Sequence, residues 1–250
     1  MINIIEKKID LIENFIDEYY SNGGCVEFAF YEIKENYLGE KSDDEYLNHL
    51  MTATQILELI NYETNFHFNK ARYSYNCIKG LISLDDLPNS TTDYSDLVAN
   101  GRKISLEEFL GPYFDVEKNM PYIKGRKDNS TLNSYFRYTD DECSGNALPM
   151  NELVKKHMEK FPSCDNGFIY ALIQPPYSMS FGETLKDRGE YVLNFFDLLF
   201  DNLDKIVVYK WSTDCNPYFN AGKEWWGAYF WTVYNPVKDI YIGIVASTTD

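Results

Sequence analysis

The sequence predicts an α+β fold: a single compact domain over residues 1–250, with helices packed on a mainly antiparallel sheet and a C-terminal β-hairpin. Two observations carry this prediction. Apolar residues recur at steps of three and four in much of residues 1–204, as on one side of a helix, whereas residues 205–250 hold three apolar runs typical of strands. Helices and strands do not alternate strictly, which favours α+β over a doubly wound parallel sheet.

The first helix is predicted from an apolar stripe that Gly23-Gly24 brings to an end. Residues 26–33 follow with the alternation of a strand. Ser42 and Glu45 have the spacing of a capping box, in which each side chain bonds a free amide of the first turn, so a second helix is expected over residues 43–61. The stripe of the first helix consists of Ile5, Ile9, Ile12, Ile16 and Tyr19.

The middle of the chain has less regular patterns. Polar clusters at residues 85–96 and 127–146 are typical of loops. Ser105 and Glu108 repeat the capping-box spacing and predict a short helix. A pair of strands is expected from the alternating aromatics Phe66, Phe68, Tyr73 and Tyr75.

Two helices and a strand are expected between residues 149 and 203. Pro149 suits the first turn of a helix that Pro162 stops. The short apolar run at residues 168–173 predicts a buried strand. A long helix follows over residues 183–203. Its apolar face, which is expected to pack on the C-terminal sheet, includes Val192, Phe196 and Leu199.

Three strands are predicted in the last part of the chain, and a loop of five residues, 235–239, joins the final two as a hairpin. Both faces of these strands are apolar, so the sheet is expected to be covered on both sides. Gly243 lacks a side chain, and a large ring on the neighbouring strand, Tyr229 or Trp231, is expected to lie across it. The strands span residues 206–211, 226–234 and 240–246.

The net charge of -16 lies entirely in residues 1–204, because residues 205–250 hold four lysines and four acidic residues. The chain therefore divides into an acidic helical part, 1–204, and a neutral, aromatic β-rich end, 205–250. Such a chain repels nucleic-acid phosphates and anionic lipid, so neither nucleic acid nor a membrane is an expected partner. A basic protein is the complementary partner, because opposite fields steer encounter. The alternative is that the acids only provide solubility.

No cofactor or metal is expected. His49, His67 and His157 do not stand near other metal ligands at a familiar spacing, and no phosphate-binding loop is present. The five cysteines are odd in number and include no Cys-x-x-Cys pair, which favours free thiols in a reducing compartment. The chain shows no signal peptide and no run of about 18 apolar residues, so the expected location is the cytoplasm.

The densest group of functional side chains is the Trp-rich loop at residues 211–227. Asp214 and Glu224 offer a carboxylate pair of the kind that glycosidases place on either side of a sugar stacked on tryptophan. The alternatives are a binding surface, or a packed corner in which tryptophans fill the core and Asp214 and Asn216 bond turn amides. The candidate binding residues are Trp211, Asp214, Asn216, Tyr218, Lys223, Glu224 and Trp225.

The run Gln174-Pro175-Pro176-Tyr177 resembles the Asp/Asn/Ser-Pro-Pro-Tyr motif of amino-group methyltransferases. The resemblance covers these four residues alone. It implies that the first of them bonds a target amine and that Tyr177 stacks on the base. Gln174 departs from the residue types of that motif, and no Gly-x-Gly turn follows an N-terminal strand to hold a cofactor.

Together these features favour an acidic cytoplasmic protein-binding protein, of the type of bacterial immunity proteins or antitoxins, that inhibits a basic partner. The alternative is an enzyme that acts on a sugar or nucleotide at the loop 211–227. Binding is favoured over catalysis because the chain carries much negative charge and no recognisable catalytic set.

Overall fold

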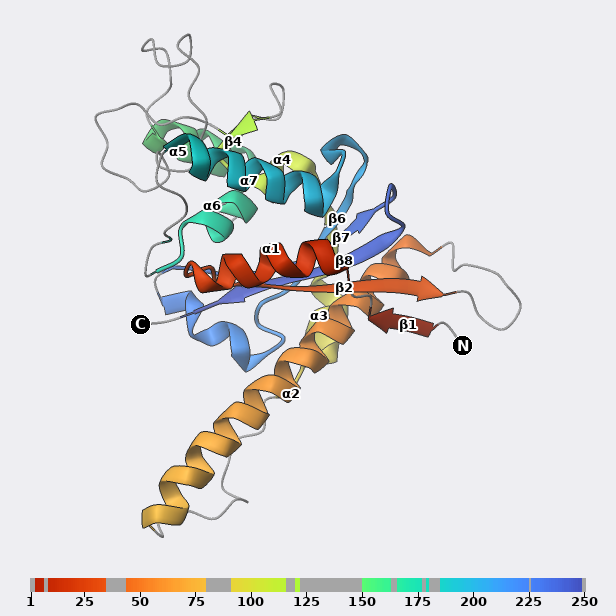
Figure 1. The fold of residues 1–250 in the computed structure, drawn as a ribbon. Helices are drawn as coiled ribbons and strands as arrows, with labels where there is room; N and C mark the ends of the chain where they lie inside the picture. Colours follow the sequence, from red (N-terminus) through yellow and green to blue (C-terminus); the bar gives the residue numbers. More distant parts are fainter. Residues whose placement is uncertain are drawn as a thin grey trace.

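The centre of the structure is a six-stranded antiparallel sheet with the strand order β1-β2-β8-β7-β6-β3 (Figure 1). Its strands are β1 (Asn3–Glu6), β2 (Val26–Lys34), β3 (Arg102–Ile104), β6 (Val207–Lys210), β7 (Ala228–Asn235) and β8 (Ile240–Ser247). A separate two-stranded sheet pairs β4 (Phe114–Asp115) with β5 (Met120–Pro121). The computed structural model describes residues 3–6, 9–34, 44–79, 91–115, 120–121, 150–162, 166–176, 179, 185–224 and 226–248.

The C-terminal hairpin predicted from the sequence is the middle of this sheet. β7 and β8 pair along their whole length, and β2 pairs with the other side of β8. The turn holds residues 236–239, one fewer than expected, because Asn235 already pairs with Ile240. The Asn235 side chain closes the turn by accepting hydrogen bonds from the amides of Val237 (2.9 Å) and Lys238 (3.2 Å).

The two faces of the sheet are covered by separate helical layers, as the apolar strands predict. Along β8, Ile242 and Ile244 belong to one buried cluster, whereas Tyr241 and Val245 belong to the other. The first layer consists of α1 (Asp10–Ser21), α4 (Leu106–Leu110), α5 (Met150–Lys160), α6 (Gly167–Ile173) and α7 (Leu185–Phe200) (Figure 1). The second consists of α2 (Glu45–Lys79), α3 (Tyr94–Asn100) and the 3-10 turns η4 (Pro217–Asn220) and η5 (Gly222–Glu224). The predicted α+β fold is confirmed.

The boundary between residues 204 and 205 divides the chain by charge and not by fold. β2, from the acidic part, pairs with β8, and β3 pairs with β6. Both parts of the chain therefore contribute strands to one sheet.

The first helix begins later than its apolar stripe suggests. Ile5 lies in β1, where it pairs with Glu32 of β2, so its assignment to the helix is wrong. A β-branched residue favours a strand when a neighbouring strand is available, and spacing along the chain does not reveal that neighbour. The helix itself, α1, begins at Asp10 and buries the remaining positions Ile12, Ile16 and Tyr19.

The helix α2 is longer than predicted, and the strand pair expected from the aromatics at residues 66–75 is wrong. No glycine or proline interrupts residues 45–79, so the helix continues through them. Its first half packs on the sheet, and its C-terminal half extends beyond the sheet (Figure 1). At its start the Asp44 carboxylate accepts a hydrogen bond from the Leu47 amide (3.0 Å). Ser42, which was predicted to cap this helix, lies outside the described residues.

The short helices near residue 100 show how local capping decides structure. α3 begins inside residues 85–96, which were expected to be a loop, and Asp93 caps it by accepting from the amides of Ser95 (3.0 Å) and Asp96 (3.1 Å). The predicted cap of α4 is confirmed, because the Ser105 hydroxyl accepts from the Glu108 amide (3.1 Å). The expected loops at 85–90 and 127–146 lie outside the described residues.

Residues 168–173 lie in the helix α6, so the predicted strand is wrong. Every side chain of α6 except Tyr170 is buried, and an apolar run without a polar face has no periodicity that distinguishes a helix from a strand. Gly167 (φ +77°) faces Gly111 (φ +82°) at the end of α4, and an added Cβ at Gly167 would lie 2.4 Å from the Gly111 Cα. This pair of glycines lets α4 and α6 meet closely.

Gly243 makes room for α2 and not for a ring of the neighbouring strand. It pairs with Thr232, and an added Cβ would lie 2.9 Å from the Cβ of Ile56 in α2. Tyr229 and Trp231 belong to the buried cluster on the opposite face, so the prediction that one of them crosses Gly243 is wrong. The missing side chain therefore sets how closely α2 approaches the sheet.

The predicted apolar face of α7 is buried on the C-terminal sheet. Val192, Phe196 and Leu199 belong to the same cluster as the inward side chains of β7 and β8. Asn235 donates a hydrogen bond from Nδ2 to the Leu199 carbonyl (3.1 Å), which ties the helix to the hairpin. The helix ends at Phe200, and the next 3-10 turn, η3 (Leu203–Lys205), leads into β6.

Replacing Phe196 with alanine should lower the free energy of unfolding by about 3–5 kcal/mol. The ring is 5% exposed and contacts the rings of Phe114, Phe168 and Phe200. Urea unfolding followed by circular dichroism measures the change. The control Leu11→Ala, at a side chain that is 60% exposed, should change the stability by less than about 0.5 kcal/mol. A loss below about 1 kcal/mol for Phe196→Ala would contradict the burial of this face of α7 against the sheet.

Candidate functional site

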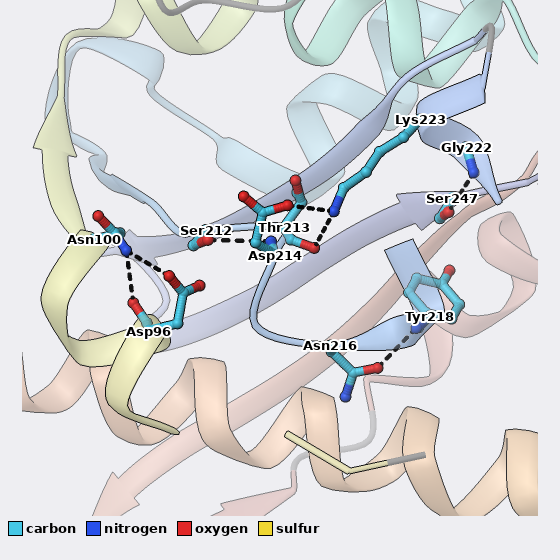
Figure 2. Close-up of polar contacts among 10 residues, drawn as sticks. All are labelled: Asp96, Asn100, Ser212, Thr213, Asp214, Asn216, Tyr218, Gly222, Lys223 and Ser247. Atoms are coloured by element: carbon cyan, nitrogen blue, oxygen red, sulfur yellow. Dashed lines mark hydrogen bonds and ion pairs between the residues drawn. The ribbon is translucent and has the colours of Figure 1, made fainter. Parts of the chain in front are cut away.

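The loop 211–227 connects β6 to β7. Its residues from Trp211 to Phe219 pack on the same face of the sheet as α2 and α3, whereas Trp226 belongs to the cluster on the other face (Figures 1 and 2). It folds into two short 3-10 turns, η4 and η5. Asn216 caps the start of η4, and Pro217 is the first residue of that turn. The sequence predicted this loop as the candidate site, and its described side chains fall into a buried set and a surface set.

Trp211 belongs to the buried set. It is 2% exposed, and its Nε1 donates a hydrogen bond to the Thr232 hydroxyl (2.9 Å). Its ring contacts those of Tyr46, Tyr209 and Phe230. A sugar or base therefore finds no free face on this indole, and the ring fills the core as the packed-corner alternative expects.

Asn216 is the polar anchor of the loop. It is 1% exposed, and its Nδ2 donates to Asn61 Oδ1 of α2 (2.9 Å) and to the Thr92 hydroxyl before α3 (3.0 Å). Its Oδ1 accepts from the amide of Tyr218 (2.9 Å), the role in turn formation that was one of its alternatives (Figure 2). One side chain thus joins the loop, α2 and α3.

Asp214 and Lys223 form an ion pair at the surface of the loop (Figure 2). Lys223 Nζ lies 2.6 Å from Asp214 Oδ1 and also donates to the Thr213 carbonyl (2.9 Å). The Asp214 side chain is 82% exposed, so the pair is worth at most about 1 kcal/mol. The turn amide at Asp214 is bonded by Ser212 Oγ (3.1 Å), so the capping role expected of Asp214 belongs to Ser212.

Glu224 and Trp225 complete the predicted set. Glu224 is exposed in η5, and Trp225 lies outside the described residues. The turn itself is fixed by Gly222, whose amide donates to the Ser247 hydroxyl (2.9 Å), as Figure 2 shows, and whose carbonyl accepts from the Gly227 amide (2.7 Å). Asp214 is thus held by an ammonium group, while Glu224 points to solvent from a separate turn.

Tyr218 leads to a polar cluster that the sequence did not predict. Burial, followed by the charges of Glu27 and Cys25, raises the pKa of the Tyr218 hydroxyl. Glu27 of β2 accepts a hydrogen bond from the Tyr20 hydroxyl (2.9 Å). Burial raises the pKa of the Glu27 carboxyl, and that hydrogen bond opposes the rise. In the sequence, the signal for this cluster was an acidic residue, Glu27, inside an otherwise apolar part of a strand.

Cys25 lies at the start of the same strand and is not a nucleophile at neutral pH. Burial, followed by the charge of Glu27, raises the pKa of its thiol to about 12. The thiolate is the reactive form of cysteine, so this side chain stays protonated and unreactive near pH 7. Cys215, in the loop, has its thiol pKa raised to about 12 by the same first cause, burial.

His49 of α2 is a core residue beneath the loop. It is fully buried, its Nδ1 lies 2.8 Å from the Thr232 hydroxyl, and its ring stacks on Tyr209 with 4.4 Å between centroids. Burial lowers the pKa of His49 to about 3, and Lys103 contributes to the shift. The imidazole is therefore neutral throughout the physiological range. Trp211 and His49 meet at a single hydroxyl, that of Thr232.

The run Gln174-Pro175-Pro176 follows a helix and not the strand that was expected. The Gln174 amide donates to the Tyr170 carbonyl at the end of α6 (2.9 Å), and the Gln174 carbonyl accepts from Trp226 Nε1 (2.5 Å). Tyr177 lies outside the described residues. These backbone contacts give the described part of the run a role in joining α6 to the start of β7.

Over the described ranges, no three His, Cys, Asp or Glu side chains gather as a metal site requires. None of the helices in these ranges is long and apolar enough to cross a bilayer.

Comparison of the chain with models of protein families, with curated proteins and with solved structures finds no match.

Asn216→Ala should lower the free energy of unfolding by about 2–3 kcal/mol, because it leaves buried polar atoms without partners. Asp214→Ala is the matched change in the same loop and should cost less than about 1 kcal/mol, because the pair with Lys223 is exposed. Urea unfolding of the two variants measures both effects. Equal losses would contradict the division of the loop into a buried anchor and a surface pair.

The stability of the protein should fall as the pH drops from about 6.5 towards 3, in part through His49. The folded pKa of about 3 is lower than the unfolded value of 6.5, so the unfolded chain binds one more proton in this window. The contribution is about 1.4 kcal/mol per pH unit. Unfolding at pH 6.5 and 4.5 should show a decrease that is about 2 kcal/mol smaller for His49→Gln than for the wild type. Identical decreases would contradict a buried neutral imidazole.

Proposed function

We propose that this chain is an acidic cytoplasmic protein that binds and inhibits a basic protein, in the manner of bacterial immunity proteins or antitoxins. The observation that carries the proposal is the charge of the second layer, formed by α2, α3 and the loop 211–227 and called here the acidic layer. Its exposed carboxylates are Asp44, Glu58, Glu63, Asp93, Asp214 and Glu224.

Two lysines in or beside the acidic layer are paired with carboxylates of the layer. Lys223 pairs with Asp214, and Lys103 of β3 pairs with Glu45 at 2.8 Å. The remaining carboxylates add to the net charge of -16. With Asp44 and Asp93 included, the layer holds more acidic than basic residues, and a net negative field attracts a partner of opposite sign and speeds its association.

The support beneath this layer suits a binding protein. Asn216 joins the loop to α2 and α3, and Trp211 and His49 are fixed on Thr232 from below. A surface held in this way loses little conformational freedom when a partner binds, so less of the interaction energy is spent on ordering it.

The alternative, an enzyme acting on a sugar or nucleotide at the loop 211–227, has less support. Trp211, one of the two tryptophans among the candidate binding residues, is covered by other rings. Asp214, one of the two expected catalytic carboxylates, is held in an ion pair with Lys223. The binding proposal uses the same residues and needs no free indole.

Capture from a lysate of the producing cells, with the chain immobilised at about 50 mM salt, should retain a basic protein in near-stoichiometric amount. The complex should release it as the salt rises, because the Debye length falls from about 10 Å at 0.1 M to about 3 Å at 1 M. Mass spectrometry identifies the protein, and an inhibition assay follows from its activity. Recovery of no basic protein at low salt would contradict the proposal.

Glu58→Lys combined with Glu224→Lys should slow association with the captured protein by about tenfold. The control, Asp17→Lys combined with Glu18→Lys, changes the net charge equally but lies on α1, on the opposite face of the sheet. Stopped-flow association should therefore change by less than about twofold for the control. Equal effects of the two pairs would show that total charge matters and that the acidic layer does not.

A further inference from the structure

The sequence contains three Asn-Gly pairs, at residues 22–23, 100–101 and 166–167, and all of them lie in the described ranges. Asparagine followed by glycine is prone to spontaneous deamidation, because a residue without a side chain leaves its backbone nitrogen open to attack the asparagine side chain. The reaction requires that this backbone N–H carries no hydrogen bond and that water reaches it. The structure distinguishes the three pairs on both points.

Two of the pairs are protected by the fold. After Asn22, the amide of Gly23 donates a hydrogen bond to the Tyr20 carbonyl (3.0 Å) at the end of α1. In the pair at the start of α6, Gly167 is buried, and a Cβ added there would overlap the backbone of Gly111. One attacking amide is therefore bonded to the helix, and the other is packed away from water.

The remaining pair, Asn100–Gly101, ends α3 and is open. Asn100 is exposed, and the Gly101 amide has no hydrogen-bond partner among the described residues, whereas the amides that end α1 and α4 bond to the preceding turn. Asn100 Nδ2 donates to the Asp96 carbonyl (3.1 Å) and to Asp96 Oδ1 (2.7 Å), as Figure 2 shows. Both bonds are exposed and are made by the nitrogen that deamidation removes, so neither of them occupies the attacking amide of Gly101.

Packing explains why a glycine follows Asn100. A Cβ added to Gly101 would overlap the indole of Trp211, which is buried at the start of the loop 211–227. Any larger residue at this position would have to displace that ring, which fills the core between α2 and the sheet. The close approach of α3 to the loop therefore requires the very residue that makes Asn100 reactive.

We propose that Asn100 is a site of spontaneous deamidation in the folded protein. The Gly101 amide loses its proton to water, and its nitrogen forms a bond to Asn100 Cγ. The bond from Cγ to Nδ2 breaks, Nδ2 takes up a proton and leaves as ammonia, and a succinimide ring remains. Water then opens the ring at either of its carbonyl carbons, which gives aspartate or isoaspartate at residue 100. The whole reaction consumes water, releases ammonia and involves no oxidation or reduction.

Either product weakens the attachment of α3 to the rest of the acidic layer. A carboxylate at residue 100 no longer donates to Asp96 and faces Asp96 Oδ1, the atom that Nδ2 now contacts at 2.7 Å. Like charges four residues apart destabilise a helix. Isoaspartate also lengthens the main chain directly before Gly101, where Trp211 leaves no room. Deamidation thus adds a negative charge to the acidic layer and loosens α3 from the loop 211–227.

Incubation of the full chain at mildly alkaline pH, followed by peptide mass spectrometry, measures the deamidation rate at each pair. Asn100 should react at least about fivefold faster than Asn22, because a backbone hydrogen bond must open before Gly23 can attack. The same chain in concentrated guanidinium chloride is the control, since all three pairs should react at similar rates once the chain is unfolded. A folded chain in which Asn100 reacts no faster than Asn22 overturns the proposal.

The variants Asn100→Gln and Asn22→Gln test the assignment independently, because the longer glutamine side chain closes a larger ring and reacts more slowly. Ion-exchange chromatography of aged protein should show an acidic form in the wild type and in Asn22→Gln, and little of it in Asn100→Gln. An acidic form that persists in Asn100→Gln assigns the reaction to another residue and overturns the proposal. Urea unfolding should also show a lower midpoint for Asn100→Asp than for the wild type, and equal midpoints would contradict the loosening of α3.

Discussion

The structure depends on the burial of both faces of the β7–β8 hairpin. A strand pair that is apolar on both sides cannot leave either side in water, so each face requires its own helical layer. The residues that alternate along β8 supply both buried clusters. The acidic part of the chain provides the covering helices and the flanking strands β2 and β3, and the neutral end provides the strands that they cover.

The second layer unites close packing with a polar junction. Gly243 leaves room for Ile56 of α2 to lie close to the sheet. On the neighbouring strand Thr232 pairs with Gly243, and its hydroxyl joins His49 to Trp211. Asn216 ties the turns of the loop to α2 in the same layer. Under the proposed function, the exposed carboxylates of this layer would stand on a support that needs little reorganisation when a partner binds.

How much of this was predictable differs between elements for physical reasons. β7 and β8 were predicted because their apolar runs are short and bounded by turn residues. α6 was not, because a fully buried run carries no periodicity, and the C-terminal half of α2 was missed because aromatics two residues apart also suit strands. In the site, the anchoring roles of Trp211 and Asn216 were among the alternatives. The Lys223–Asp214 pair depends on the path of the turns, and the contact of Glu27 with Tyr20 depends on which face of the sheet Glu27 occupies. Spacing along the chain reveals neither.

The continuity of α2 gives the protein a mechanical property. One half of this helix is locked to the sheet at Ile56 and His49, while the other half extends beyond the sheet (Figure 1). Isolated helical segments of this length are only marginally stable in water, so amides beyond Asn61 should open and exchange with solvent far faster than those near Ile56. Under the proposed function, a partner that binds this half would slow that exchange. Amide exchange in the projecting half of α2 would then report binding without any movement of the core.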